Sequence, residues 1–185
     1  MENYGFRTMK KILATLAASI LVTGTAAAES LIDGDAEAGK AKSITCAACH
    51  GQDGNSVNPA WPSLAGQHAG YAYEQLQAFK GGRRNNALML GQVMALSDED
   101  MKNLAVYYES MPAAAKSVAD PASVDLGERL YRGGDREKSI SACIACHGPT
   151  GRGNPASIVP SVRGQYAVYN AAQLRTYASG ERATD

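Results

Sequence analysis

The residues best suited to chemistry in this chain form a pentapeptide that occurs twice, at Cys46–His50 and at Cys143–His147. Its pattern, C-x-x-C-H, is typical of covalent haem attachment, in which two thiols become thioethers and the histidine binds iron. Cysteines three residues apart lie on neighbouring helical turns, so both sulfur atoms can reach one edge of a flat macrocycle. We therefore expect two covalently bound haem c groups, with iron held by His50 and His147. The cysteines that would carry them are Cys46, Cys49, Cys143 and Cys146.

Two other uses of paired cysteines fit the chain less well. A thioredoxin-like redox pair would accompany a βαβ pattern, which the sequence lacks. The four cysteines are enough for a zinc site built from two C-x-x-C pairs. Zinc would leave the repeated adjacent histidine and the export signal described below unexplained, so covalent haem is the preferred interpretation.

Composition narrows the class of protein. All four cysteines among the 185 residues lie in the two motifs, which leaves none for a structural disulfide. Hydrophobic residues make up 45%, as in ordinary globular proteins. The formal net charge is zero, which argues against a nucleic-acid binder that works by neutralising phosphates.

The first 28 residues have the pattern of a cleavable signal peptide. Lys10 and Lys11 precede an apolar run over 12–22, and small residues end at Ala28. The run is short for a membrane span, which needs about 20 apolar residues, although an uncleaved anchor is the alternative. Export to an oxidising compartment suits haem attachment, and we expect the protein in the periplasm.

Self-alignment of the chain shows a duplicated domain. The stretch after His50, with W-P-S-L-A-G-Q over 61–67, matches V-P-S-V-R-G-Q over 159–165. Further matches at an offset of 98 pair Gln75 with Gln173 and Arg84 with Arg182. We therefore expect domain 1 over 29–111, a linker over 112–123 and domain 2 over 124–185.

Each copy is predicted to be a set of short helices joined by Gly/Pro loops. In the first copy, helices are expected over 36–44, 71–80 and from a Ser97 cap to about residue 111. No alternating β pattern is evident, so the predicted fold class is all-α.

Domain 1 also offers a second iron ligand. Met89 and Met94 lie between the Gly81-Gly82 stop and Ser97, in a stretch expected to be a loop. Met101 and Met111 instead fall on the apolar stripe of the last helix and are interpreted as core residues. A thioether ligand would raise the reduction potential of the iron.

The quoted motifs give the chain a specific resemblance. CAACHGQDGNS, YEQLQAFKGG and LSDEDMKNLAVYYESM resemble the N-terminal half of a dihaem cytochrome c4, and CIACHGPTGRGN, PSVRGQYAVYNAAQL and YASGER resemble its C-terminal half. The resemblance covers nearly all of the chain after the signal and implies two tandem cytochrome c-like domains. It favours Met89 over Met94 as the distal ligand. It also implies that the carbonyls of Pro62 and Pro160 hold His50 and His147.

Domain 2 departs from the family pattern. The last methionine is Met111, so no thioether follows the linker, and the sequence stops three residues after Arg182. We expect domain 2 to be incomplete at its C-terminus, without the ligand loop and closing helix, because the sequence is truncated there. If the chain were complete, the iron of domain 2 would be open or would take a makeshift ligand. His68, whose repeat partner is Tyr166, is interpreted as a surface residue near the domain interface.

These features predict an electron carrier rather than an enzyme. The resemblance implies a quinol–cytochrome c oxidoreductase as donor, a haem–copper oxidase as acceptor and loose association with a membrane surface. Alternatives are a haem subunit of an oxidoreductase, a dihaem peroxidase or a gas or redox sensor. The charge is uneven, with 7 basic and 10 acidic residues over 29–117 and 8 basic and 7 acidic over 118–185, which would favour weak, salt-sensitive docking.

Overall fold

The protein is described here by a computed structural model, which covers residues 30–116 and 120–183. The predicted signal peptide lies outside these residues. The described chain is helical, with two isolated β-bridges and no strand, so the all-α prediction is confirmed. The helices of the first half are α2 (Ala36–Lys42), α3 (Ile44–His50), α4 (Ala69–Lys80), α5 (Ala87–Val93) and α6 (Asp98–Ser110). Those of the second half are η1 (Pro121–Ser123), α7 (Val124–Gly133), α8 (Ile144–His147), η2 (Pro155–Ser157) and α9 (Ala167–Ala178).

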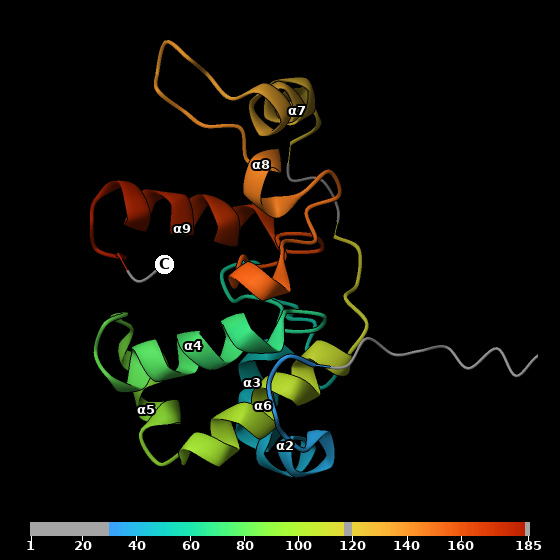
Figure 1. Ribbon diagram of the computed structural model, residues 1–185, viewed down its shortest axis with the longest axis vertical. Helices are drawn as coiled ribbons and strands as arrows, with labels where there is room; N and C mark the ends of the chain where they lie inside the picture. The colour runs from blue at the N-terminus through green and yellow to red at the C-terminus, as the bar shows by residue number, and fades with distance from the viewer. Residues whose placement is uncertain (1–29, 117–119, 184–185) are drawn as a thin grey trace, which may run out of the picture.

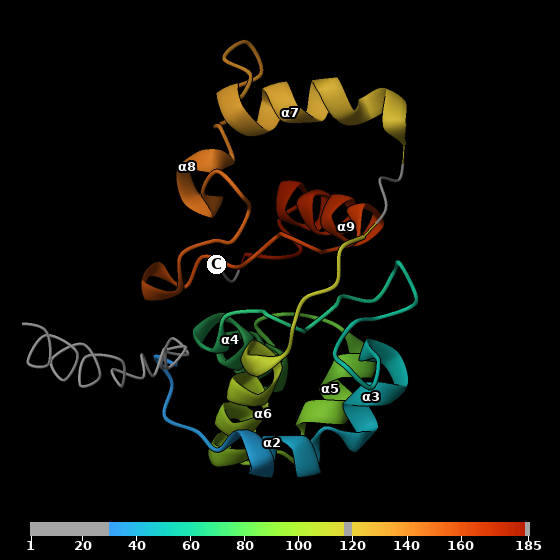
Figure 2. The ribbon, with the colours of Figure 1, turned by 90° about the vertical axis from the view of Figure 1, so that its right-hand side faces the viewer.

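The molecule has two lobes, which correspond to the two copies of the repeat. Figure 1 shows α2 to α6 in one lobe and α7 to α9 in the other, with α4 and α9 on the facing sides. Figure 2, turned by 90°, keeps the same division and shows the chain after α6, up to residue 116, leaving the first lobe towards the second. Each lobe contains one C-x-x-C-H motif, so each can house one haem.

In the first lobe, α6 packs against both α2 and α4 and forms the core. The buried apolar side chains of the described residues all lie in this lobe. The crossing of α2 and α6 depends on Gly39, where an added Cβ would lie 2.1 Å from the Asn103 carbonyl oxygen. Only glycine allows two helix backbones to approach this closely. Met101 is buried together with Leu104 and Tyr108, so its predicted core position is confirmed. Met111, also predicted as a core residue, is the C-cap of α6 and is only half-buried.

A capping box starts α6. The Ser97 hydroxyl accepts from the Asp100 N–H at 3.0 Å, and the Asp100 carboxylate accepts from the Ser97 N–H at 2.9 Å. These two bonds satisfy N–H groups that the first helical turn leaves without partners. The predicted start of this helix is therefore confirmed. The predicted helix over 36–44 is instead interrupted at Ser43, between α2 and α3.

The prediction of a loop around Met89 is wrong. Residues 87–93 form α5, whose N-cap Asn86 accepts from the Met89 N–H at 3.0 Å through its side chain. Val93 on this helix is buried, so one apolar anchor and one cap are enough to order a short helix next to α4.

The second lobe has no counterpart of α5 or α6 among the described residues. On α7, a Cβ added at Gly127 would meet no atom within 4 Å, in contrast to the close contact at Gly39 of α2. Apolar side chains are correspondingly exposed, including Leu126 on α7 and Leu174 on α9. Among the described residues, no helix therefore packs on α7 in the way that α6 packs on α2.

The two lobes meet through polar contacts between residues that are partners in the repeat. Arg84 donates to Tyr169 Oη and Gln173 Oε1, each at 2.9 Å. Reciprocally, Arg182 donates to Tyr71 Oη at 2.7 Å and to Gln75 Oε1 at 3.0 Å. The first residues after α6 also join the lobes, since Lys116 donates to Ser56 O and lies over the Tyr166 ring.

Candidate haem-binding sites

The first motif lies on α3, and in the second motif Cys143 caps α8, which carries the rest. None of the four cysteines is paired in a disulfide. Cys46 is half-buried, whereas Cys49, Cys143 and Cys146 are exposed. The donor set therefore fits a haem c in both lobes, because each motif offers two accessible thiols and an imidazole on one helical segment. Elsewhere in the described ranges, no three His, Cys, Asp or Glu side chains converge as a metal site would require.

Burial sets the protonation of the first site. The His50 side chain is only 6% exposed. Burial lowers its pKa, and the hydrogen bond to Pro62 opposes this effect only in part. A lowered pKa favours the neutral imidazole, which is the form that binds a metal. Burial also raises the pKa of the Cys46 thiol.

A proline carbonyl faces the histidine of each motif. The His50 Nδ1 atom lies 2.8 Å from Pro62 O, and the His147 Nδ1 atom lies 2.9 Å from Pro160 O. A carbonyl oxygen can only accept, so Nδ1 must carry the proton and the Nε2 lone pair is left for iron. The resemblance implies these two contacts; their action on a bound haem remains a prediction.

The same loop geometry positions both prolines. Gly54 O accepts from the N–H groups of Leu64 and Ala65 at 2.7 and 3.0 Å. Gly151 O accepts in the same way from Val162 and Arg163 at 2.8 and 3.0 Å. Gly54 has a φ of +70°, which a side chain would strain, so glycine is required where the loop turns back. The repeat thus builds one histidine support twice.

The two candidate methionines differ in burial. Met89 lies within α5 and is half-buried, whereas Met94 follows that helix and is 57% exposed. The assignment of Met89 as the distal ligand remains a prediction, now placed on a helix rather than in a loop. In domain 2 no methionine is present to match it.

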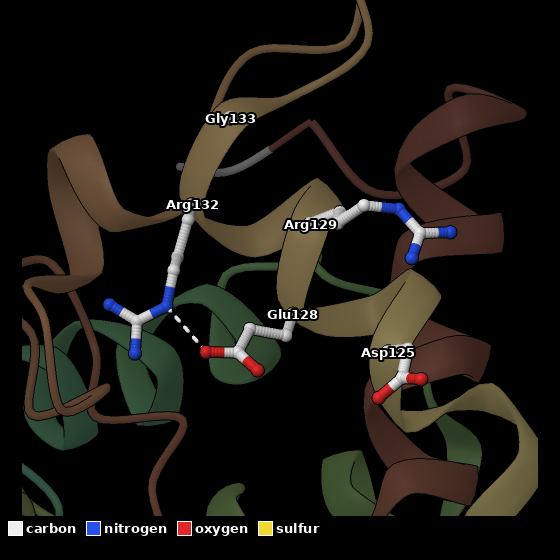
Figure 3. A pocket seen from close by; sticks show the side chains of 5 residues that line it. All are labelled: Asp125, Glu128, Arg129, Arg132 and Gly133. Atoms are coloured by element: carbon white, nitrogen blue, oxygen red, sulfur yellow. Dashed lines mark hydrogen bonds and ion pairs between the residues drawn. The ribbon is translucent and has the colours of Figure 1, made fainter.

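A groove along α7 is lined by charged side chains, as Figure 3 shows. Arg132 Nε pairs with Glu128 Oε1 at 2.8 Å, and both side chains are exposed. The residues that line the groove are Asp125, Glu128, Arg129, Arg132 and Gly133, which include no cysteine or histidine. The groove therefore offers none of the thiol or imidazole groups that the two C-x-x-C-H motifs supply.

His68 lies at the interface, where its Nε2 atom is 2.6 Å from Arg152 O. Its side chain is 17% exposed, so it is more enclosed than a surface residue, although the predicted position is confirmed. Sequence reasoning gave no role to the other interface residues, Gln67, Gln165, Arg84 and Arg182. Their identity at equivalent positions of the two copies was the available signal.

Comparison with known proteins decides the family. The family model for cytochrome c matches residues 36–112. A cytochrome c4 of Stutzerimonas stutzeri is 40% identical over 186 residues, covering 96% of this chain and 86% of that protein. The crystal structure of reduced recombinant cytochrome c4 from Pseudomonas stutzeri superimposes with a TM-score of 0.78 at 41% identity, covering 82% of this chain and 84% of that one. The chain belongs to the cytochrome c4 family.

Membership in the cytochrome c4 family fixes the cofactors and the general activity. The protein is a dihaem c-type cytochrome that transfers electrons. Another relative, the thiosulfate dehydrogenase electron acceptor of Stutzerimonas stutzeri strain A1501, is 42% identical over 145 residues, covering 77% of this chain and 67% of that protein. Within the described residues, no helix has the length and apolarity needed to cross a membrane.

Proposed function

We propose that this cytochrome is a periplasmic carrier that passes single electrons between respiratory complexes, towards a terminal haem–copper oxidase. When bound, a haem c supplies a one-electron couple at its iron. His50 and His147 would ligate the iron atoms, the four motif cysteines would tether the two porphyrins, and Met89 would complete the first site. The observation that best supports the proposal is the duplicated His–Pro support in two lobes that contact each other directly.

Electron transfer needs ligands that move little when the charge on iron changes. Pro62 and Pro160 fix the orientation of each imidazole, and the bonds to Gly54 and Gly151 fix the loops that carry the prolines. A rigid, doubly supported ligand set suits an electron carrier, which has no substrate to admit.

Mixing experiments test the proposed acceptor. The reduced holoprotein is mixed with a haem–copper oxidase, and oxidation of its α-band absorbance is followed in a stopped-flow instrument. Rapid oxidation, and rapid reduction by quinol in the presence of a quinol–cytochrome c oxidoreductase, are expected. Failure of both reactions with a fully haem-loaded protein would refute the proposed role between these complexes.

A second candidate is an electron acceptor for a thiosulfate-oxidising dehydrogenase. The related acceptor from strain A1501 favours this function. The test is to mix the oxidised holoprotein with such a dehydrogenase and thiosulfate and to measure the rate of its reduction. A rate above that obtained with quinol and the quinol–cytochrome c oxidoreductase would establish the dehydrogenase as donor in place of that oxidoreductase.

An open iron in domain 2 would favour the enzymatic alternative, a dihaem peroxidase or an oxidoreductase subunit. Carbon monoxide distinguishes a site of this kind, because an open ferrous haem binds the gas readily and a His/Met site does not. Peroxide turnover by the reduced protein, accompanied by carbon monoxide binding at one haem, would move the assignment to the enzyme class.

A further inference from the structure

Two glutamines, one from each lobe, reach across the interface to the same kind of target. Gln165 Oε1 accepts from the Ser63 N–H, and Gln165 Nε2 donates to Ser63 O, both at 3.0 Å. In the mirrored contact, Gln67 Oε1 accepts from the Ser161 N–H at 2.8 Å and Gln67 Nε2 donates to Ser161 O at 2.9 Å. Each side-chain amide thus binds both backbone groups of one serine in the opposite lobe.

Each glutamine Oε1 atom accepts a hydrogen bond from the N–H of a particular peptide group. The carbonyl of that same peptide group faces the histidine of a C-x-x-C-H motif. The Ser63 N–H and the Pro62 C=O belong to one peptide group, and that carbonyl faces His50 Nδ1 at 2.8 Å. A continuous series of hydrogen bonds therefore runs from the Gln165 amide, through one peptide group, to the imidazole of the other lobe. The equivalent series runs from Gln67 to His147.

Hydrogen bonds in series polarise one another. Accepting from the N–H of a peptide group makes the carbonyl of that group a stronger acceptor. A stronger acceptor at Nδ1 makes the imidazole a more basic ligand, which stabilises ferric over ferrous iron and lowers the reduction potential. Because Ser63 is buried, water is poorly placed to replace the glutamine oxygen there.

We propose that Gln165 and Gln67 are positioning residues that tune the axial histidine of the opposite domain, Gln165 acting on His50 and Gln67 on His147. The inference rests on the proposed function in one respect, the assignment of the two histidines as iron ligands. Its consequence is that contact between the domains adjusts the potential of each haem, on top of the larger effect of the axial ligands.

A control variant can distinguish the tuning of the histidines from a general weakening of the contact between the lobes. Tyr166 donates to Ser56 O at 2.8 Å across the same interface, and Ser56 is not part of the Pro62 peptide group. The arginine contacts to Tyr169 and Gln173 also bypass both prolines. Tyr166→Phe therefore removes a cross-lobe hydrogen bond without interrupting either series, and serves as the matched control.

The test compares Gln165→Leu with Gln67→Leu in the full holoprotein, since leucine keeps the bulk and removes the amide. Spectroelectrochemistry measures the potential of each haem. We expect Gln165→Leu to raise the domain 1 potential and Gln67→Leu to raise the domain 2 potential. The distribution of one electron between the haems should shift roughly twofold to tenfold, in opposite directions for the two variants.

NMR identifies which histidine responds. In reduced protein saturated with carbon monoxide, where low-spin ferrous iron is diamagnetic, the His50 Nδ1–H resonance should move upfield only in Gln165→Leu. The His147 resonance should move upfield only in Gln67→Leu, and Tyr166→Phe should leave both in place. The proposal would be overturned if the potential and the Nδ1–H resonance changed only in the domain that contains the substituted glutamine. Equal changes in both domains, or no change in either, would also overturn it.

Failure of this test is distinct from failure of the proposed function. Two haems with unchanged potentials in the glutamine variants would remove the tuning and leave the carrier intact. If each glutamine substitution changed the potential of the opposite haem but the oxidase did not oxidise the protein, the tuning would stand and the proposed carrier role would fail.

Discussion

At the scale of single residues, the two histidine supports are the main result. His50 and His147 lie in short helices of different length, and one is buried while the other is half-buried, yet their distances to a proline carbonyl differ by 0.1 Å. The loops that carry the prolines are held in the same way by Gly54 and Gly151. Local backbone bonding, rather than the core of each lobe, therefore sets the orientation of the ligand.

Replacing Met89 tests the distal ligand of domain 1. Met89→Ala should abolish the weak charge-transfer band of methionine-ligated ferric haem. It should also lower the domain 1 potential by a sizeable part of the ~0.8 V range that axial ligands span, because the thioether favours ferrous iron. Optical spectra and potentiometry check both effects. Met94→Ala is the control, and loss of the band in that variant alone would transfer the role to Met94.

Most of these residues could be predicted from the sequence, for a physical reason. Haem attachment demands fixed residue types at fixed spacing, so the cysteines and histidines stand out without any knowledge of the fold. Interface residues such as Gln67 carry no such local pattern. Their role depends on which loop of the other lobe they meet, and only the three-dimensional arrangement shows that.

At the scale of helices, α6 organises domain 1. It carries four of the nine buried apolar residues in the described chain, more than any other helix, and packs on α2 and α4. Its start was predictable because Ser97 and three acidic residues form a local signal. By contrast, α5 was predicted as a loop, since seven residues that include Gly91 show no clear period. The Asn86 cap and the burial of Val93 stabilise these residues as a helix.

The Gly39 crossing allows a comparison between the two domains. Gly39→Ala should destabilise domain 1 by about 3 kcal/mol, because the new methyl group would overlap the Asn103 carbonyl of α6. Gly127→Ala on α7 should stabilise that helix by about 0.5–1 kcal/mol, since alanine fits open space in a helix. Thermal unfolding followed at each haem measures both. Equal effects of the two substitutions would contradict the packing described for α2.

Asp100 gives α6 a pH dependence. Its bonds to Ser97, and secondarily its ion pair with Lys42 at 2.9 Å, lower its pKa from 3.8 to about 2. The stabilisation is therefore fully present above pH 4 and is lost as the pH falls through 2. In Asp100→Asn, the free energy of unfolding should be lower at pH 7 and should fall less steeply in acid.

Denaturant titrations between pH 2 and 7 measure this dependence. The control is Glu99→Gln, which changes an acidic residue of the same helical turn outside the capping box. If the free energy of unfolding falls below pH 4 as steeply in Asp100→Asn as in the unsubstituted protein, other groups control unfolding at low pH.

At the scale of the whole molecule, two similar lobes face each other through paired polar residues, while the two halves of the sequence differ in net charge. The sequence over 29–117 is net acidic and that over 118–185 is slightly basic. Duplication explains the symmetric interface, because each contact made by one copy can be returned by the other. This asymmetry of charge would favour docking of differently charged partners on the two lobes.

Salt should slow the reactions of this carrier with its partners. Charge-steered association weakens as the Debye length falls from about 30 Å at 0.01 M to about 8 Å at 0.15 M ionic strength. We expect second-order rates with the oxidase to drop several-fold over this range, while electron exchange between the two haems stays constant. Stopped-flow measurements at several salt concentrations would show it, and flat bimolecular rates would exclude electrostatic docking.

The central claim is that both C-x-x-C-H motifs carry covalent haem, with iron bound by their histidines. Proteolysis of the purified holoprotein, followed by mass spectrometry of the peptides, tests it most directly. The account predicts one haem on the peptide with Cys46 and Cys49 and a second on the peptide with Cys143 and Cys146. Unmodified cysteines in either peptide of a fully matured protein would contradict it.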